Sequence, residues 1–196
     1  GKTGDGSLSI AFENIHTIAK QPNGSLVKLK SGREVLLSGS NDVNKDNRGI
    51  VVNVEKLGKI TIPWSRFETV TFGKPGKYLL PGYRDFAKSE KIEGEVVTKT
   101  GLVYKGVIVY DLDEEFSFEL IQGNDNGIDY AVAASNIRKI VPVDNKCRIT
   151  MKNGKSILIG GTHDVAEYNS GVLIFKNASD QPVYLKWASV KEINLQ

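Results

Sequence analysis

The first residues that could do chemistry lie in a loop of alternating oxygen-bearing side chains. Asp42, Asn44 and Asp46 are each two residues apart, the spacing of the first ligands in a calcium-binding loop, where hard oxygen atoms surround one cation. The place of the last, bidentate carboxylate of such a loop holds Asn53. A Ca²⁺ site is one candidate here, and a turn whose polar side chains bond to nearby backbone is the interpretation we favour.

A second candidate is an acidic run in the middle of the chain. Asp111, Asp113, Glu114 and Glu115 could hold a cation or supply the paired carboxylates of a glycoside hydrolase, although adjacent carboxylates on a turn also form an ordinary solvated loop. His163 is a further binding candidate. No G-x-S-x-G nucleophile motif accompanies it, so we expect a polar loop residue and no catalytic site.

These candidates belong to a chain that contains an internal repeat. Residues 25–52 and 147–174 align without a gap at a constant offset of 122 positions. A loop that begins at Asp42 in the first copy begins at Asp164 in the second, where Tyr168 replaces Asp46. A metal site shared by both copies is therefore excluded. Identical residues stand at Lys30 and Lys152, Gly32 and Gly154, Leu36 and Leu158, Gly39 and Gly161, Asp42 and Asp164, Val43 and Val165, Asn47 and Asn169, and Gly49 and Gly171.

The repeated segments have the pattern of antiparallel strands. Val27 and Leu29 alternate with lysines, the two-residue period of a half-buried strand. The pairs Ser31-Gly32 and Asn153-Gly154 then predict tight hairpin turns, since glycine supplies a positive φ. Each unit ends in a short signature, such as WSRFETV at 64–70 and WASVKEI at 187–193, which predicts a 3₁₀ or helical turn before the next strand.

The fold class predicted is all-β, with repeated antiparallel units that form small barrel-like or sandwich modules. We expect an N-terminal β unit at 1–72, a basic connector with Pro and Gly at 73–91, and a C-terminal β region at 92–196. That region would contain a middle unit at 92–140, with strands at 104–110, 116–121 and 128–132, and the second copy at 141–196. Exposed sheet edges would allow oligomers to form.

Bulk composition excludes several classes of protein. No apolar run approaches the roughly 20 residues of a membrane-spanning helix. The net charge of +3 is small for a nucleic-acid-binding protein, so no nucleic acid is expected as partner. Cys147 is the single cysteine, which excludes an intrachain disulfide, and its strand neighbours predict burial. Gly1 precedes a polar stretch, as in a mature exported protein or a protein after tag cleavage, so we expect a bacterial periplasmic or cell-surface protein.

Two resemblances add expectations about function. The run VVTKTGLVYKGVIVYDLDEE at 96–115 resembles the first half of an Sm-like or SH3-like small barrel, which in Sm-like proteins precedes an RNA-binding loop. The whole chain resembles uncharacterised exported β-repeat proteins of bacteria, which implies no known activity. The leading hypothesis is a non-catalytic exported module that binds a protein or a cell-surface polymer, or that builds an assembly. The alternatives are an Sm/SH3-like nucleic-acid-binding protein and a carbohydrate-active hydrolase.

Overall fold

The computed structural model describes residues 1–4, 6–54, 56–73, 89–177 and 181–196, and it confirms an all-β chain. The described helical segments are 3₁₀ turns of three residues each: η1 (Phe12–Asn14), η3 (Ala134–Asn136), η4 (His163–Val165) and η5 (Trp187–Ser189). Of these, η5 lies in the signature at 187–193, as predicted. In the described part of the chain, no helix is long and apolar enough to cross a membrane.

The chain divides into two compact units, and most of the first copy of the repeat lies in the N-terminal one. This unit comprises residues 1–50 and 62–86. Its main sheet has the strand order β5-β4-β3-β8, with β1 and β2 as a separate two-stranded sheet. Ile15, Val27, Leu37 and Val43 form its buried core. The strands are β1 (Lys2–Thr3), β2 (Gly6–Ser7), β3 (Ile15–Gln21), β4 (Gly24–Leu29), β5 (Glu34–Leu37) and β8 (Thr69–Thr71).

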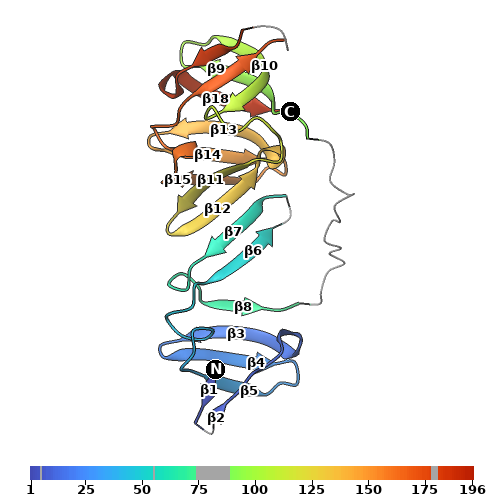
Figure 1. The fold of residues 1–196 in the computed structure, drawn as a ribbon, viewed down its shortest axis with the longest axis vertical. Helices are drawn as coiled ribbons and strands as arrows, with labels where there is room; N and C mark the ends of the chain where they lie inside the picture. The colour runs from blue at the N-terminus through green and yellow to red at the C-terminus, as the bar shows by residue number, and fades with distance from the viewer. Residues whose placement is uncertain (5, 55, 74–88, 178–180) are drawn as a thin grey trace. The chain divides into compact units, whose positions relative to one another are not determined.

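The C-terminal unit comprises residues 51–61 and 87–196 and contains the larger core. Its strands form a continuous sheet in the order β17-β16-β10-β9-β18-β13-β14-β15-β11-β12-β7-β6, and most of this order can be followed in Figure 1. This order has two open ends. The strands are β6 (Ile50–Val54), β7 (Gly58–Ile62), β9 (Glu93–Thr98), β10 (Val103–Tyr110), β11 (Leu120–Asp125), β12 (Ile128–Ala133), β13 (Ile137–Val143), β14 (Lys146–Met151), β15 (Ser156–Gly160), β16 (Val172–Phe175), β17 (Val183–Leu185) and β18 (Val190–Leu195).

The strand registers confirm the internal repeat. In the first copy β3 pairs with β8, so that Ile18 lies opposite Val70. In the second copy β13 pairs with β18, so that Ile140 lies opposite Ile193. These pairs are related by offsets of 122 and 123, as the sequence alignment with its one-residue slip requires. A shift in the strand register also recurs. It follows Ile15 in the first copy and the equivalent residue Ile137 in the second.

The structure extends the repeat beyond the alignment, to the first residues of the chain. Lys2 lies opposite Ser7 in the hairpin β1–β2, and Asn124 lies opposite Asp129 in the hairpin β11–β12, again at an offset of 122. In each copy, this hairpin pairs with the same position of the repeat. Lys2 forms a β-bridge with Ser38, and Asn124 pairs with Gly160, which is the residue equivalent to Ser38. Residues 1–4, 6 and 7 therefore have the same place in the repeat as residues 123–126, 128 and 129, although few of their side chains match.

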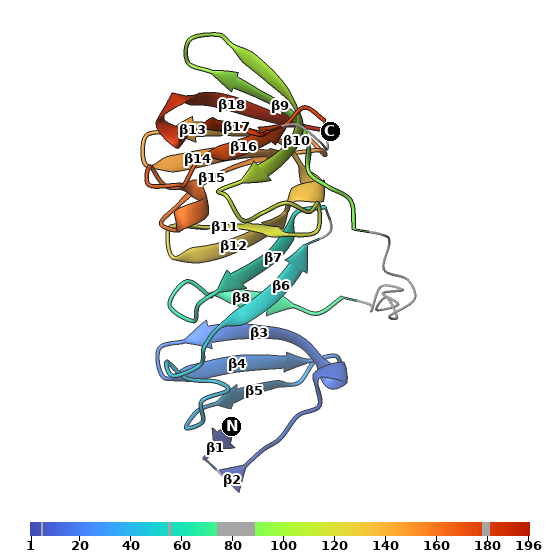
Figure 2. The same cartoon turned by 45° about the horizontal axis from the view of Figure 1, so that its top comes forward.

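Hairpins of the C-terminal unit pair with strands from distant parts of the sequence. The hairpin β11–β12 of the expected middle unit joins β15 of the second copy. The hairpin β16–β17 of the second copy joins β10 of the middle unit, as Figure 2 shows. Residues 92–140 and 141–196 therefore share one sheet. In the first copy, the hairpin β6–β7 pairs through β7 with β12, which places residues 51–61 in the C-terminal unit.

Several sequence expectations can be located on this framework. Cys147 is fully buried, as its neighbours predicted. Trp64 stacks on Phe67 with ring centroids 4.8 Å apart, and Trp187 meets Tyr110 edge-on at 5.7 Å, so both tryptophans serve packing. Most of the connector predicted at 73–91 lies outside the described residues. The strand predicted at 116–121 is wrong by four residues, because β11 begins at Leu120.

Candidate functional site: the acidic turn after β10

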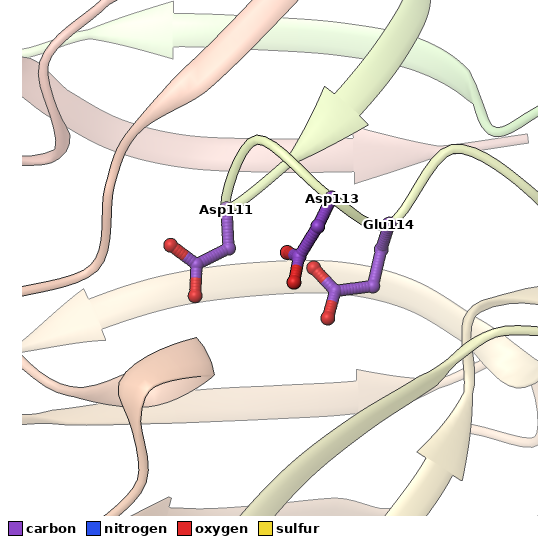
Figure 3. Close-up of side chains that lie close together, drawn as sticks. All are labelled: Asp111, Asp113 and Glu114. Atoms are coloured by element: carbon purple, nitrogen blue, oxygen red, sulfur yellow. The ribbon is translucent and has the colours of Figure 1, made fainter.

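The acidic run forms a tight turn at the end of β10. Asp111 and Leu112 both have positive φ values, 50° and 71°, a conformation that few non-glycine residues adopt. The backbone N–H groups of Asp113 and Glu114 donate to the carbonyl of Tyr110 at 3.1 and 2.9 Å, which closes the turn. Figure 3 shows the side chains of Asp111, Asp113 and Glu114 projecting from the same side of this turn. Among the described residues, one carboxylate oxygen from each of these three side chains lies within 4.8 Å of the other two.

Asp111 is the buried member of this group, and both of its oxygen atoms are already used. Its Oδ2 lies 2.6 Å from Nδ1 of His163, and its Oδ1 accepts a hydrogen bond from the backbone N–H of Ser170. The hydrogen bond to this carboxylate raises the pKa of His163 above its ordinary value. The pair of Asp111 and His163 thus ties the acidic turn to the loop between β15 and β16.

Asp164 makes a second tie between the same elements. Its Oδ2 accepts a hydrogen bond of 2.7 Å from the backbone N–H of Gln122 in β11, and its carbonyl accepts one from the hydroxyl of Tyr110. Thr162 donates to the carbonyl of Gln122 at 2.6 Å. Burial raises the pKa values of both Tyr110 and Asp164. The loop that contains η4 therefore joins the end of β10 to β11.

Glu114 has the most perturbed carboxyl group of the site. Burial, followed by hydrogen bonding with Asp113, raises the pKa of Glu114 to about 9. Its Oε2 is buried and makes no hydrogen bond. The raised pKa favours the protonated form of this carboxyl group, which reduces the repulsion among the neighbouring carboxylates. A divalent cation could replace the proton, but it would have to compete with the existing contacts of Asp111.

The structure brings together Asp111, Asp113, Glu114 and His163 and places Glu115 elsewhere. Glu115 forms an ion pair with Lys91, and its backbone N–H donates to Oε2 of Glu119 at 2.6 Å. Sequence reasoning did not select Tyr110, Asp164 and Ser170 for this site. One signal was available for Asp164, because it is identical to Asp42 in the other copy of the repeat.

Two of the three calcium candidates, Asn44 and Asp46, make hydrogen bonds or ion pairs within the first loop. Asn44 Oδ1 accepts a hydrogen bond from the backbone N–H of Asp46 at 2.9 Å, and Asp46 pairs with its neighbour Lys45 at 3.1 Å. Asn47 donates to the carbonyl of Asp42 at 2.9 Å. These are the local side-chain contacts of a turn, in which the polar atoms bond to the loop itself.

The second copy uses the same hydrogen bonds at the equivalent positions. Asn169 Nδ2 donates to the carbonyl of Asp164 at 2.9 Å, and Asn169 Oδ1 accepts from the backbone N–H of Gly171 at 2.9 Å. In the first copy Asn47 Oδ1 accepts from Gly49 at 2.7 Å. The shared asparagine thus holds the loop before β6 and before β16.

A half-open hollow of about 480 Å³ lies elsewhere in the C-terminal unit. Both acidic and basic groups line it, including Glu90, Glu93 and Lys152, whose Nζ donates to the carbonyl of Gln196 at 2.9 Å. This mixed lining favours no single charge in a ligand.

Comparison of the chain with protein-family models, with curated proteins and with solved structures finds no match. Function is therefore inferred from the contacts described above.

Proposed function

We propose that this chain is a non-catalytic binding or structural module of an exported bacterial protein, and that it contacts a partner protein through its sheets. The observation that carries this proposal is the use made of the reactive side chains. These side chains form hydrogen bonds with one another or with the backbone of neighbouring segments, and they belong to Tyr110, Asp111, His163 and Asp164. The use of these side chains to hold loops together supports a structural role for this part of the chain.

The pairing of distant hairpins supports the same proposal. Within the C-terminal unit, β16 pairs with β10, and β11 pairs with β15, across more than thirty residues of sequence in each case. Strand edges of this repeat therefore accept hairpins that are not adjacent in the chain. Main-chain pairing at a sheet edge is also a general way for one protein to bind another.

Exposed apolar side chains supply surfaces for such contacts in each unit. Leu36 on β5 is 60% exposed, Val51 on β6 is 57% exposed, and Phe118 before β11 is 58% exposed. Phe118 also stacks on Phe116, with ring centroids 5.6 Å apart, and large apolar groups that occur together at a surface are typical of protein interfaces. The proposal thus predicts that partner proteins contact these positions, whereas a surface polymer would not require them.

Photo-crosslinking in the cells that make the protein tests this proposal. A photoreactive amino acid placed in turn at Leu36, Val51 and Phe118 is expected to give discrete protein adducts at one or more of these positions. The same group at Lys45, an exposed charged position, is the matched control. Adducts to polymer alone, adducts equal to those of the control, or no adducts at any of the three positions would overturn the proposal.

A further inference from the structure

The strands β6 and β16 are equivalent in the repeat, but their neighbours differ. In the second copy, β16 pairs with β17 on one edge and with β10 on the other. Ile174 lies opposite Ile108, and Val172 lies opposite Tyr110. In the first copy, β6 is the last strand of its sheet, with β7 as its neighbour. Among the described residues, no strand occupies the edge of β6 that corresponds to the β10 edge of β16.

The burial of equivalent side chains follows this difference. Val172 and Ile174 of β16 are fully buried. Their equivalents at an offset of 122 are Ile50, which is half-buried, and Val52, which is 37% exposed. Strand β6 thus has apolar residues at the positions that are buried in β16. The backbone groups on its outer edge have no strand partner among the described residues.

The contact with β10 also has a specific steric requirement. Gly106 in β10 has φ = 153°, and a Cβ atom added there would lie 2.1 Å from the carbonyl oxygen of Phe175. Only glycine permits this close approach. The residue equivalent to Phe175 in the first copy is Asn53, so a strand that pairs with β6 in the same register would also need glycine at this point.

A separate observation in the N-terminal unit points the same way. In the second copy, β18 pairs with β13 and also with β9, the strand before β10. Its equivalent β8 pairs with β3. In the part of the chain that the structure describes, β8 has no second neighbour. Among the described strands, the first copy therefore has neither of the neighbours that the hairpin β9–β10 supplies to the second copy.

We infer that the edge of β6 that no described strand occupies binds an extended strand of the β10 type, donated by a partner polypeptide and paired antiparallel to β6. The bound strand places consecutive apolar residues opposite Val52, Val51 and Ile50, and a glycine two residues before the first of them. This inference rests on the proposed function and names the class of partner. A folded second copy of this chain does not fit, because its own β10 is already paired with β9 and β16.

A peptide with the sequence of residues 93–110, which forms β9–β10 in this chain, is the probe for this site. Its binding to the full chain is measured by fluorescence anisotropy, and hydrogen exchange then locates the contact. We expect saturable binding with Kd below about 1 mM and slower exchange at residues 50–54. Val52→Lys should weaken binding at least about tenfold, because it places a charge on the paired edge. Val51→Lys, at a more exposed position, is the second variant should Val52→Lys disturb folding.

Two controls distinguish binding at this site from non-specific binding of the peptide to exposed apolar surface. Leu158→Lys changes an exposed apolar residue of β15 and should leave the affinity unchanged. A peptide with Gly106→Ala should lose binding if the register matches that of β10 on β16. No saturable binding, binding insensitive to Val51→Lys and Val52→Lys, or protection outside residues 50–54 would overturn the inference. So would a dimer of the chain that is abolished by Val52→Lys while the peptide does not bind. Protein adducts at Leu36 or Phe118 would leave the proposed function standing in any of these cases.

Discussion

Removal of the Asn169 side chain tests whether the loop before β16 is a structural tie. Asn169 is 6% exposed and makes two hydrogen bonds, with the carbonyl of Asp164 and the N–H of Gly171. A neutral hydrogen bond contributes about 0.5–1.5 kcal/mol net, and a buried group left without its partner costs more. Asn169→Ala should therefore lower the free energy of unfolding by about 2–3 kcal/mol.

The equivalent substitution in the first copy is the matched control. Asn47 makes the same pair of hydrogen bonds, at 2.9 and 2.7 Å, but it is only half-buried. Water can replace the lost partners there, so Asn47→Ala should cost about 1 kcal/mol. The two variants thus compare the same bonds at two degrees of burial.

Urea unfolding followed by circular dichroism measures both changes. For a chain of this size, 1 kcal/mol corresponds to a shift in Tm of about 2–4 °C, so Asn169→Ala should melt about 4–12 °C lower. A cost below about 0.5 kcal/mol for Asn169→Ala, or a larger cost for Asn47→Ala than for Asn169→Ala, would refute the reasoning. Either result would mean that the recurring asparagine does not hold the loop through these bonds.

Four further outcomes follow from contacts in the C-terminal unit. Gly171→Ala should destabilise by more than about 2 kcal/mol in urea unfolding, because φ is 100° and a Cβ would lie 2.4 Å from a backbone carbonyl; a neutral effect would contradict this close approach. The raised pKa of His163 adds stability that is fully present below about pH 6.5 and is lost as pH rises through the raised pKa. The loss of unfolding free energy in His163→Gln should therefore be largest in acid and become smaller in base, and a loss that is constant with pH would refute this. Millimolar Ca²⁺ should leave Tm unchanged within about 1 °C, because both oxygens of Asp111 have partners; a saturable rise would reveal a cation site. Burial raises the pKa of Cys147 to about 12, so Ellman's reagent should react only after unfolding, and rapid reaction of the folded protein would contradict its burial.

The repeat and its turns could be predicted from sequence because they depend on local chemistry. Gly32 and Gly154 have φ values of 89° and 86°, as the predicted hairpin turns require. The signature at 187–193 contains the 3₁₀ turn η5 followed by the start of β18. In these segments, a glycine, a two-residue alternation or a short apolar spacing determines the local backbone, and each is visible in a few consecutive residues.

The choice of strand partners could not be predicted in the same way. A two-residue alternation indicates which face of a strand is buried, but not which distant edge the strand joins. The pairing of Asn124 with Gly160, and of β7 with β12, is determined by the three-dimensional arrangement. The role of β1–β2 was also hidden, because Lys2 and Asn124 have equivalent positions but different side chains.

The candidate site was predictable in part for the same reason. Asp111, Asp113 and Glu114 are close in sequence, so their clustering was evident from the run itself. The contacts of Asp111 with His163 and Ser170 join residues more than fifty positions apart. The sequence pattern predicted a solvated loop at this turn, whereas Asp111 is only 6% exposed. A buried carboxylate of this kind needs hydrogen-bond partners that only the folded chain supplies.

The exchange of hairpins restricts how a protein of this design can be lengthened or divided. A cut between β13 and β14 would separate β15 from the hairpin that covers it, and would separate β10 from β16. Each fragment would then expose an apolar edge and tend to aggregate or to reassociate with the other. Duplication can avoid this only if the donor hairpin and the strand that accepts it are copied together.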